Sequence, residues 1–376
     1  MKRIVYILLA VLTAYLLVCC GAKNEQNLGL FTTLKYAPKQ ATGFTILADS
    51  EGNKLLSVTR PWQGESPDVQ SLAIFASNEA AKGYTGQYIV GAAERVVCMS
   101  TSYVAMLDAL GLSDAVVGVS GKHYVMNERV RTNPEVRDVG YDASLDYEAM
   151  LLLDADLVLL YGVSAENSAV TSKLRELGIP YIYLGDYTEQ SPLGKAEWVV
   201  AIAEIMGCRE RGEELFDGIV ERYEAVRASV AQSEGGKRVM FNLPYQDVWY
   251  MPSDDSYMVQ LVEDAGGQYI YKGMNPTSGS KGISLEEAIA LVSKADVWLN
   301  VGQCLTLDEV RGSAPLFAQM EVVKRGEVYN NNRRRGEGGG SDFWESAIVC
   351  PDVVLQDLVN ILQGEGQELY YHHKLQ

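Results

Sequence analysis

The stretch SLDYEAMLLLDADLVLLYG, residues 144–162, decides the fold because its pattern returns as SLEEAIALVSKADVWLNVG at residues 284–302. Each copy begins with Ser-Leu-acid, continues with helical spacing, and ends with an Ala-Asp pair before an apolar strand. The matching positions are all 140 residues apart. Further strings recur in the same order: Arg95-Val96-Val97 and Ser102-Tyr103 match Arg238-Val239-Met240 and Ser256-Tyr257, and Gly178–Tyr181 resembles Gly326–Tyr329. The recurrence predicts two copies of one α/β lobe.

Between the two copies, residues from Lys195 to about Gln232 have apolar side chains at helical spacing, with Pro192 before them and Gly235-Gly236 after. We expect one long connecting helix of about 57 Å, because each helical residue adds about 1.5 Å. A helical bridge resists bending, so the cleft between the lobes should be largely pre-formed and close by a small hinge movement, if at all.

Before the first lobe lies a segment of different character. Phe44–Asp49 and Lys54–Arg60 have strand composition and are joined by Ser50–Asn53, which suits a hairpin turn. Ser71–Ala76 and Gln87–Val90 indicate further short strands. A β-rich extension is therefore predicted.

The chain starts with Lys2 and Arg3 and has no charge from Ile4 to Ala22. A basic start followed by a short apolar run is typical of a secretory signal. Leu17, three places before Cys20, with Gly21 after that cysteine, resembles a bacterial lipobox, so Cys20 is the expected lipidation site. A single transmembrane anchor, which needs about 20 apolar residues, is the alternative.

Composition narrows the function. The 376 residues are 47% hydrophobic and 22% charged, which excludes disorder and a polytopic membrane protein. The formal net charge of −17 becomes −19 when Lys2 and Arg3 leave with the signal, which disfavours nucleic acid as a partner. Cys98, Cys208, Cys304 and Cys350 form no CxxC pair, and separate thiols are expected, although an oxidising periplasm would permit one bridge.

These observations divide the chain into six parts. The expected boundaries are a signal peptide at 1–19, a tether and β-rich extension at 20–91, an N-terminal α/β lobe at 92–194, the connecting helix at 195–234, a C-terminal α/β lobe at 235–362, and a tail at 363–376.

A lipoprotein signal, two similar lobes and one connecting helix together resemble the substrate-binding proteins of ABC importers for iron siderophores, haem and vitamin B12. The resemblance covers about Ala92 to Leu362, and residues 144–162 are similar to the family's S-L-E-x-I-x-x-L-x-P-D-L-V segment. Asn330–Trp344 resembles a variant common in Bacteroidetes. The resemblance implies a class III periplasmic binding fold with Rossmann-like lobes, a lipid-anchored monomer in the periplasm, a chelate ligand, and an ABC permease as partner.

The resemblance also implies one acidic docking residue on each lobe for permease arginines. By position these are Glu148, with Asp146 as the alternate, and either Glu286 or Glu287. The same acids would also stabilise the first turn of a helix without any partner.

Ligands of two-lobed α/β proteins bind at loops that leave the carboxyl ends of strands. Aromatic residues gather at the predicted strand exits, where rings supply contact area and a hydrogen-bonding tip, although each alone could be a core residue. The candidates from this rule are Ser100, Tyr103, His123, Tyr124, Tyr161, Tyr245 and Trp249, and Trp344 belongs to the candidate set as well.

Three adjacent arginines, Arg333, Arg334 and Arg335, stand out in an acidic chain. Their forked donors suit the carboxylates of haem or of a citrate-type chelate, and the alternative is a solvated surface turn.

Enzymatic chemistry has little support. Neither GxSxG nor HExxH occurs, and the three histidines are His123, His372 and His373, which also disfavours a bare metal ion. We therefore expect a binding protein without a cofactor. An enzyme on the same fold and a surface sensor or partner-binding lipoprotein without a transport role are the alternatives.

Overall fold

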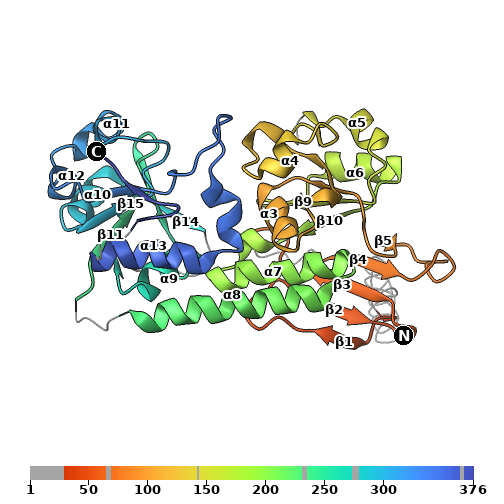
Figure 1. The fold of residues 1–376 in the computed structure, drawn as a ribbon. Helices are drawn as coiled ribbons and strands as arrows, with labels where there is room; N and C mark the ends of the chain where they lie inside the picture. Colours follow the sequence, from red (N-terminus) through yellow and green to blue (C-terminus); the bar gives the residue numbers. More distant parts are fainter. Residues whose placement is uncertain (1–28, 65–68, 142–143, 231–234, 273–278, 365–367) are drawn as a thin grey trace, which may run out of the picture.

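The computed structural model describes residues 29–64, 69–141, 144–230, 235–272, 279–364 and 368–376. The predicted signal segment and Cys20 lie outside these residues. Two α/β lobes lie side by side above the helices α7 (Pro192–Ile205) and α8 (Arg209–Ser229), and a separate sheet lies beside the first lobe (Figure 1). Within the described ranges, none of the helices has the length and apolar character to cross a bilayer.

The β-rich extension is confirmed as a five-stranded sheet with the order β1-β2-β3-β4-β5. Its first four strands pair antiparallel and β5 pairs parallel with β4. Asp49 closes the predicted hairpin turn, because its Oδ1 accepts hydrogen bonds from the backbone amides of Glu51 and Asn53. The strands are β1 (Thr33–Tyr36), β2 (Phe44–Ala48), β3 (Lys54–Val58), β4 (Gln70–Phe75) and β5 (Gln87–Val90).

The two lobes share one strand order, which confirms the predicted repeat. The first sheet runs β10-β9-β6-β7-β8 and the second runs β13-β11-β15-β16-β17, so β7-β6-β9-β10 corresponds to β13-β11-β15-β16. All pairs are parallel except β16 with β17. The strands are β6 (Val96–Cys98), β7 (Val116–Val119), β8 (Arg137–Asp138), β9 (Leu157–Tyr161), β10 (Tyr181–Leu184), β11 (Arg238–Phe241), β13 (Gln268–Tyr269), β15 (Val297–Leu299), β16 (Val328–Asn330) and β17 (His373–Lys374).

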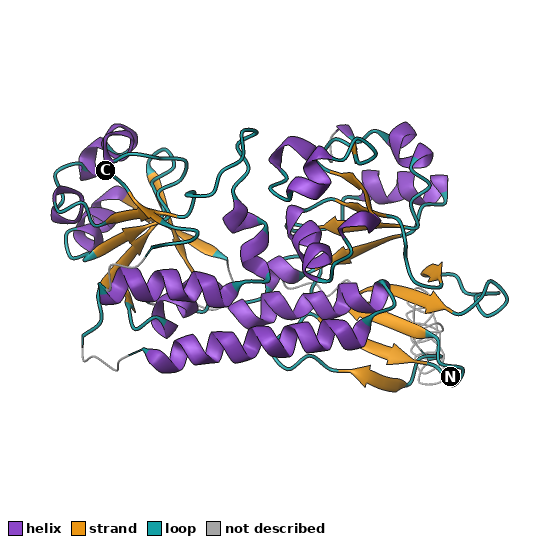
Figure 2. Cartoon of the chain, viewed as in Figure 1, coloured by secondary structure: helices purple, strands orange, loops and turns teal. Residues whose placement is uncertain are grey.

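Helices lie on both sides of the strands in each lobe (Figure 2). A small antiparallel ribbon, β12 (Val248–Pro252) with β14 (Ser280–Ser284), precedes α10 in the second lobe. The helices are α3 (Thr101–Ala109), α4 (Glu128–Thr132), α5 (Tyr147–Leu152), α6 (Ser168–Leu177), α9 (Tyr257–Asp264), α10 (Leu285–Val292), α11 (Leu307–Ser313), α12 (Glu321–Lys324) and α13 (Pro351–Gln363), and the 3-10 turns are η1 (Ser113–Ala115), η2 (Lys122–Tyr124), η4 (Asp186–Thr188), η5 (Pro315–Phe317), η6 (Asp342–Trp344) and η7 (Ser346–Ile348).

The prediction of one continuous connecting helix is wrong. The segment is a helical hairpin, because Gly207 adopts a positive φ of 69° that ends α7 before α8 begins. At Gly212 an added Cβ would lie 2.4 Å from the Cβ of Ala203, so glycine lets the two helices approach closely. Only α8, about 32 Å long by helical rise, continues from the hairpin turn to the second lobe, where it packs on α13.

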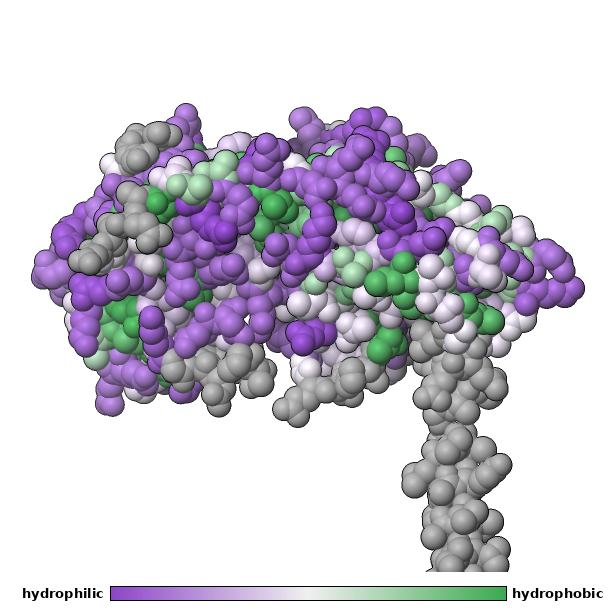
Figure 3. Space-filling model, turned by 90° about the horizontal axis from the view of Figure 1, so that it is seen from below, coloured by the Kyte–Doolittle hydropathy of each residue, from purple (hydrophilic) through white to green (hydrophobic). Residues whose placement is uncertain are grey.

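The two helices of the hairpin differ in burial. Nearly every residue of α7 is buried, whereas α8 buries one stripe formed by Gly212, Phe216, Ile219 and Tyr223. Seen from below, where α8 lies, the surface is mainly hydrophilic, with hydrophobic residues in separate patches (Figure 3). The hairpin therefore has one buried helix and one solvent-facing helix.

The extension is held to α7 by two buried carboxylates. Glu197 accepts hydrogen bonds from the Tyr36 hydroxyl at 2.6 Å and from the backbone amides of Lys39, Gln40 and Ala41. Glu189, which lies just before α7, accepts from the amides of Thr42 and Gly43 and from the indole of Trp198. Both acids are buried, so these bonds replace the water that each carboxylate loses.

We predict that Glu197→Gln lowers the free energy of unfolding by at least about 2 kcal/mol. An amide keeps one acceptor and places N–H donors against backbone N–H groups, so at least one charge-assisted bond is lost inside the protein. Urea unfolding gives the value, and Glu214→Gln, an exposed acid on α8, is the matched control. Equal stability of both variants would contradict the role given to Glu197.

Candidate ligand-binding site

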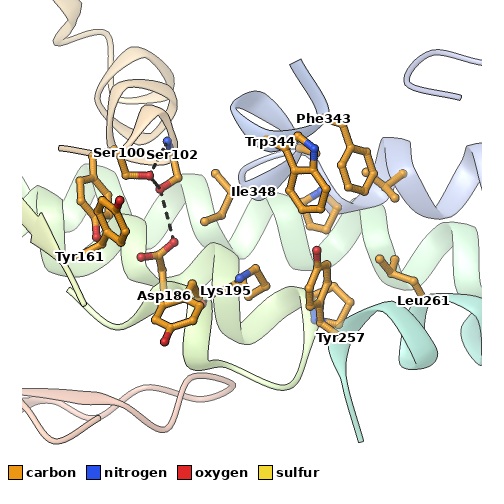
Figure 4. A pocket seen from close by; sticks show the side chains of 16 residues that line it. Ser100, Ser102, Tyr161, Asp186, Lys195, Tyr257, Leu261, Phe343, Trp344 and Ile348 are labelled. Carbon is orange, nitrogen blue, oxygen red and sulfur yellow. Dashed lines mark hydrogen bonds between the residues drawn. The ribbon is translucent and has the colours of Figure 1, made fainter. Parts of the chain in front are cut away.

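A cavity of about 370 Å³ lies between the two lobes, and we call it the main cavity. Its first-lobe wall comes from the exits of β6, β9 and β10 and from the start of α7, and its second-lobe wall comes from α9, η6, η7 and α13. Tyr161, Trp344 and Tyr257 surround it in Figure 4. Its lining residues are Ser100, Ser102, Tyr103, Tyr161, Asp186, Tyr187, Pro192, Lys195, Tyr257, Leu261, Phe343, Trp344, Ala347, Ile348, Pro351 and Val354.

A short polar network lies on the first-lobe side. Ser100 caps α3, and its hydroxyl lies 2.8 Å from that of Ser102, which donates to Asp186 Oδ2 at 3.4 Å (Figure 4). The Tyr103 hydroxyl donates to the Leu160 carbonyl at 3.1 Å. Burial raises the pKa of the Asp186 carboxyl above its ordinary value. Asp186 therefore ionises less readily than an exposed aspartate does.

Lys195 brings an ammonium group to the same cavity. Its Nζ donates to the Asp186 carbonyl at 3.0 Å and lies 4.8 Å from the centre of the Tyr257 ring. Burial lowers the pKa of Lys195, and the nearby Asp186 and Glu189 act in the opposite direction. Lys195 thus places a hydrogen-bond donor in the first-lobe wall of the main cavity.

Three tyrosines of the main cavity have a raised pKa. Burial raises the pKa of Tyr103, Tyr187 and Tyr257, so these residues present neutral hydroxyls. Across the described ranges, no group of three or more His, Cys, Asp and Glu residues could hold a metal ion. The aromatic and aliphatic side chains that line the main cavity suit an organic body with aromatic or aliphatic surface.

Four of the sequence-predicted ligand residues line the main cavity: Ser100, Tyr103, Tyr161 and Trp344. Two of them are accessible, since Tyr161 is 40% exposed and Trp344 is 59% exposed. The rule that ligands meet strand exits holds for these first-lobe positions, because Ser100 follows β6 and Tyr161 ends β9.

Four other predicted residues lie elsewhere. Tyr124 lines a smaller neighbouring cavity, and the His123 ring packs against the Tyr124 ring with centroids 4.0 Å apart. Tyr245 is 68% exposed and is not part of the main cavity wall. Trp249 is fully buried in the second lobe, where its indole donates to the Phe241 carbonyl, so the structure makes it a core residue.

The three arginines line a separate open groove together with Met126, Glu368, Leu369 and Tyr370. Arg334 donates to Asp342 at 2.6 Å and lies 4.4 Å above the Tyr370 ring, while Arg333 pairs with Glu368. Arg333 and Arg334 therefore already have protein partners, and none of the three arginines lines the main cavity.

Sequence reasoning missed Asp186, Lys195 and Tyr257. Two signals were present: Asp186 follows the exit of β10, and Tyr257 is the repeat partner of Tyr103. Lys195 had no such signal, because its place in the wall depends on where the start of α7 meets the second lobe.

A carboxylate links the two lobes beside the site. Glu345 follows η6 in the second lobe and accepts hydrogen bonds from the backbone amides of Met126 and Asn127 in the first lobe, at 2.7 and 2.6 Å. Its exposed fraction is 2%. Burial raises the pKa of Glu345 to about 7, Asp342 and Asp108 add to the rise, and the two amides oppose it.

The candidate docking acids are all at the surface. Glu148 lies in the first turn of α5, and Glu286 and Glu287 lie in the first turn of α10. Asp146 is the N-cap of α5, because its Oδ1 accepts from the Ala149 amide at 2.9 Å. The cap role leaves Glu148 as the less engaged acid of that pair.

We predict that Glu345 makes the fold less stable as pH rises from about 4.5 to about 7. A carboxyl whose pKa is raised in the folded state contributes most to folding stability at pH values below its unfolded pKa. That contribution is lost when the carboxyl ionises inside the protein. The stability of wild type relative to Glu345→Gln should fall over this range by up to about 3 kcal/mol, at about 1.4 kcal/mol per pKa unit.

Urea unfolding at pH 4.5, 6 and 8 measures this difference. The control is Glu337→Gln, which changes an exposed acid on the neighbouring loop and should give a difference that does not vary with pH. A pH-independent difference for Glu345→Gln would refute the prediction.

Comparisons with known proteins agree with this architecture. The family model for periplasmic binding proteins matches residues 96–332, well over half of the chain. An uncharacterized lipoprotein of Methanocaldococcus jannaschii is 24% identical over 285 residues, which are 72% of this chain and 66% of that protein. A cobalamin-binding protein of Halobacterium salinarum is 27% identical over 238 residues, which are 63% of this chain and 61% of that protein. The chain thus spans somewhat less than two thirds of the length of these two relatives.

A solved structure has the same fold. The crystal structure of a periplasmic heme-binding protein from Pseudomonas aeruginosa superposes with a TM-score of 0.58 at 16% identity and covers 76% of this chain and 98% of that one. The similarity of Asn330–Trp344 to a Bacteroidetes variant stays a prediction. The family match across both lobes and the shared two-lobe fold show that the chain belongs to the periplasmic binding protein family, a family of binding proteins and not of enzymes.

Proposed function

We propose that this chain is the substrate-binding lipoprotein of an ABC importer and that it captures an iron chelate, haem or a corrinoid in the main cavity. The observation that carries the proposal is the aromatic-lined cavity between the two lobes, whose first-lobe wall is formed at strand exits. Large rings in the wall suit a flat, partly apolar ligand.

The chemistry of the wall supports an intact organic ligand. Tyr161, Tyr257 and Trp344 supply ring surface, while Lys195 and the Ser100 hydroxyl supply polar contacts. The names of similar proteins point the same way, since one relative is a cobalamin-binding protein and one structural neighbour is a heme-binding protein.

The proposal includes a lipid anchor at Cys20 and a place in the periplasm. The lipobox-like residues before Cys20 and the lipoprotein relative support it. The sheet that begins at Thr33 would then join the tether to the first lobe, and the protein would act as a monomer at the membrane surface.

The partner is an ABC permease that contacts Glu148 on the first lobe and Glu286 or Glu287 on the second. These acids lie on the helices α5 and α10, which occupy equivalent places in the repeat. Beside Glu148, Leu152 is 88% exposed and Leu151 is 50% exposed, which is consistent with a protein contact.

We predict tight one-to-one binding of haem, cobalamin, ferric citrate or a hydroxamate siderophore to the protein without residues 1–20. Tyr257→Ala and Trp344→Ala should each weaken binding by at least about tenfold, because each removes a ring from the wall. Isothermal titration calorimetry gives the affinities.

The matched control is Tyr245→Ala, which removes an exposed tyrosine outside the main cavity and should leave the affinity unchanged. Trp344 is 59% exposed and lines the main cavity, whereas the other four tryptophans are buried, so loss of the Trp344 ring should also reduce quenching of tryptophan fluorescence by the ligand. If wild type binds none of the four ligands, the proposed function is wrong.

We predict that Glu148→Lys combined with Glu286→Lys reduces ligand uptake by cells at least about tenfold without changing ligand affinity in solution. Reversed charges would repel permease arginines, whereas neither residue lines the main cavity. The control is Glu221→Lys on the outer face of α8. Normal uptake by the double variant would show that neither acid takes part in docking.

A further inference from the structure

A second, smaller cavity lies next to the main cavity and has a different chemistry. Its volume is about 230 Å³, and Trp344 lines both cavities. The first lobe also links them, because Thr101 lines the small cavity while its neighbours Ser100 and Ser102 line the main cavity. The residues that line the small cavity are Thr101, Tyr124, Gly302, Gln303, Asn331, Asn332, Gly339, Gly340, Ser341 and Trp344.

Strand exits of both lobes meet at the small cavity. Thr101 follows β6, Gly302 and Gln303 follow β15, and Asn331 and Asn332 follow β16. This is the place where ligands of α/β sheets bind. None of the ten lining residues carries a charged side chain, so the wall is polar and neutral.

Three consecutive asparagines lie at the end of β16, and the second and third of them line the small cavity. The side chains of Asn330 and Asn332 are held by hydrogen bonds. Asn330 Nδ2 donates to the carbonyls of Gly302 and Cys304 at 3.0 and 2.7 Å. Asn332 Nδ2 donates to the Cys304 carbonyl at 3.2 Å, and its Oδ1 lies 2.7 Å from His373 Nε2. These bonds fix the loop after β15 against β16.

Asn331 is different. Asn331 is only 5% exposed and lines the small cavity, yet its side-chain Nδ2 has no hydrogen-bond partner among the described residues. A buried donor without an acceptor costs about 1–3 kcal/mol, so folding alone gives no reason for it. The backbone around it is well held, because Asn331 N donates to Asn330 Oδ1 and the Ser341 hydroxyl donates to the Asn331 carbonyl.

The first lobe faces this amide with the start of a helix. Thr101 is the first residue of the nine-residue helix α3, whose N-terminal end carries a partial positive charge from the helix dipole, while Ser100 already accepts from the Ser102 amide. The Asn331 amide of the second lobe and the positive end of the α3 dipole in the first lobe thus border the same cavity, and its lining contains no carboxylate.

The loop that covers the small cavity is fitted closely to the first lobe. Cβ atoms added at Gly338 and Gly340 would lie 1.9 Å from the carbonyl oxygens of His123 and Tyr124. Glu345 holds the same two lobes together through Met126 and Asn127. The donors are therefore already positioned before a ligand enters.

From this placement we infer that the small cavity is a subsite for an oxygen acceptor on an arm of the ligand, a carboxylate or a carboxamide carbonyl, and that Asn331 determines specificity for that arm. The apolar body of the ligand would lie in the main cavity, and the arm would pass Trp344 to reach Asn331 and the start of α3. This inference rests on the proposed function.

The test compares wild type with Asn331→Leu and Asn330→Leu, using calorimetric titration with haem, cobalamin, ferric citrate and a hydroxamate siderophore, and thermal unfolding without ligand. Asn331→Leu should weaken binding by at least about tenfold, because a lost bond to an acceptor arm is worth about 1.4 kcal/mol or more. Its unfolding midpoint should equal or exceed that of wild type, because the change removes an unpaired donor. Asn330→Leu is the matched structural control and should lower the midpoint.

Asn331→Asp separates the two kinds of arm. A carboxylate arm, as in haem, should bind more weakly to the Asn331→Asp variant than to the leucine variant, because like charges repel. A carboxamide arm, as in cobalamin, can donate to the new carboxylate.

Equal affinity of wild type and Asn331→Leu would overturn the inference and leave the proposed function standing. A loss of affinity that comes with the same loss of stability as in Asn330→Leu would overturn it as well. If wild type binds none of the four ligands, the proposed function fails and the inference fails with it.

Discussion

The burial of Glu197 and Glu189 is the constraint on which the arrangement of the molecule depends. Each carboxylate gives up water and must receive several N–H or O–H donors at fixed positions, which residues 36–43 and Trp198 provide. Those donors lie before β2 and on α7. The sheet, the helical hairpin and the first lobe are therefore fixed relative to one another. The β-rich extension is therefore part of the folded body and not a separate module.

The helix α7 connects this constraint to the binding site. Its first turn supplies Pro192 and Lys195 to the main cavity, while its middle carries Glu197 and Trp198 on the extension side. One continuous set of buried residues includes Phe44 of the extension, Trp198 of α7 and residues of both lobes. We expect a cavity built on such a connected core to keep its shape without ligand, which would lower the entropy cost of binding.

The two lobes meet through polar contacts as well as through the core. Glu345 reaches backbone amides of the first lobe, and glycines at 338 and 340 allow the covering loop to approach that lobe. Because burial raises the pKa of Glu345 to about 7, this contact between the lobes should respond to pH near neutrality. Two of the three adjacent arginines have acidic partners, since Arg333 pairs with Glu368 and Arg334 pairs with Asp342.

The sequence by itself determined the repeated lobes, four of the five strands of the extension and the first-lobe residues Ser100 and Tyr161, because these follow from local periodicity and from the rule for strand exits. It did not indicate the strand β1. Only the tertiary structure decided the hairpin turn at Gly207, since helical spacing is the same in one long helix and in two packed ones. It also decided that Trp249 is in the core and that Lys195 and Asn331 face cavities between the lobes. Those outcomes depend on which distant segments pack together, and side-chain burial of that kind has no signature in local sequence.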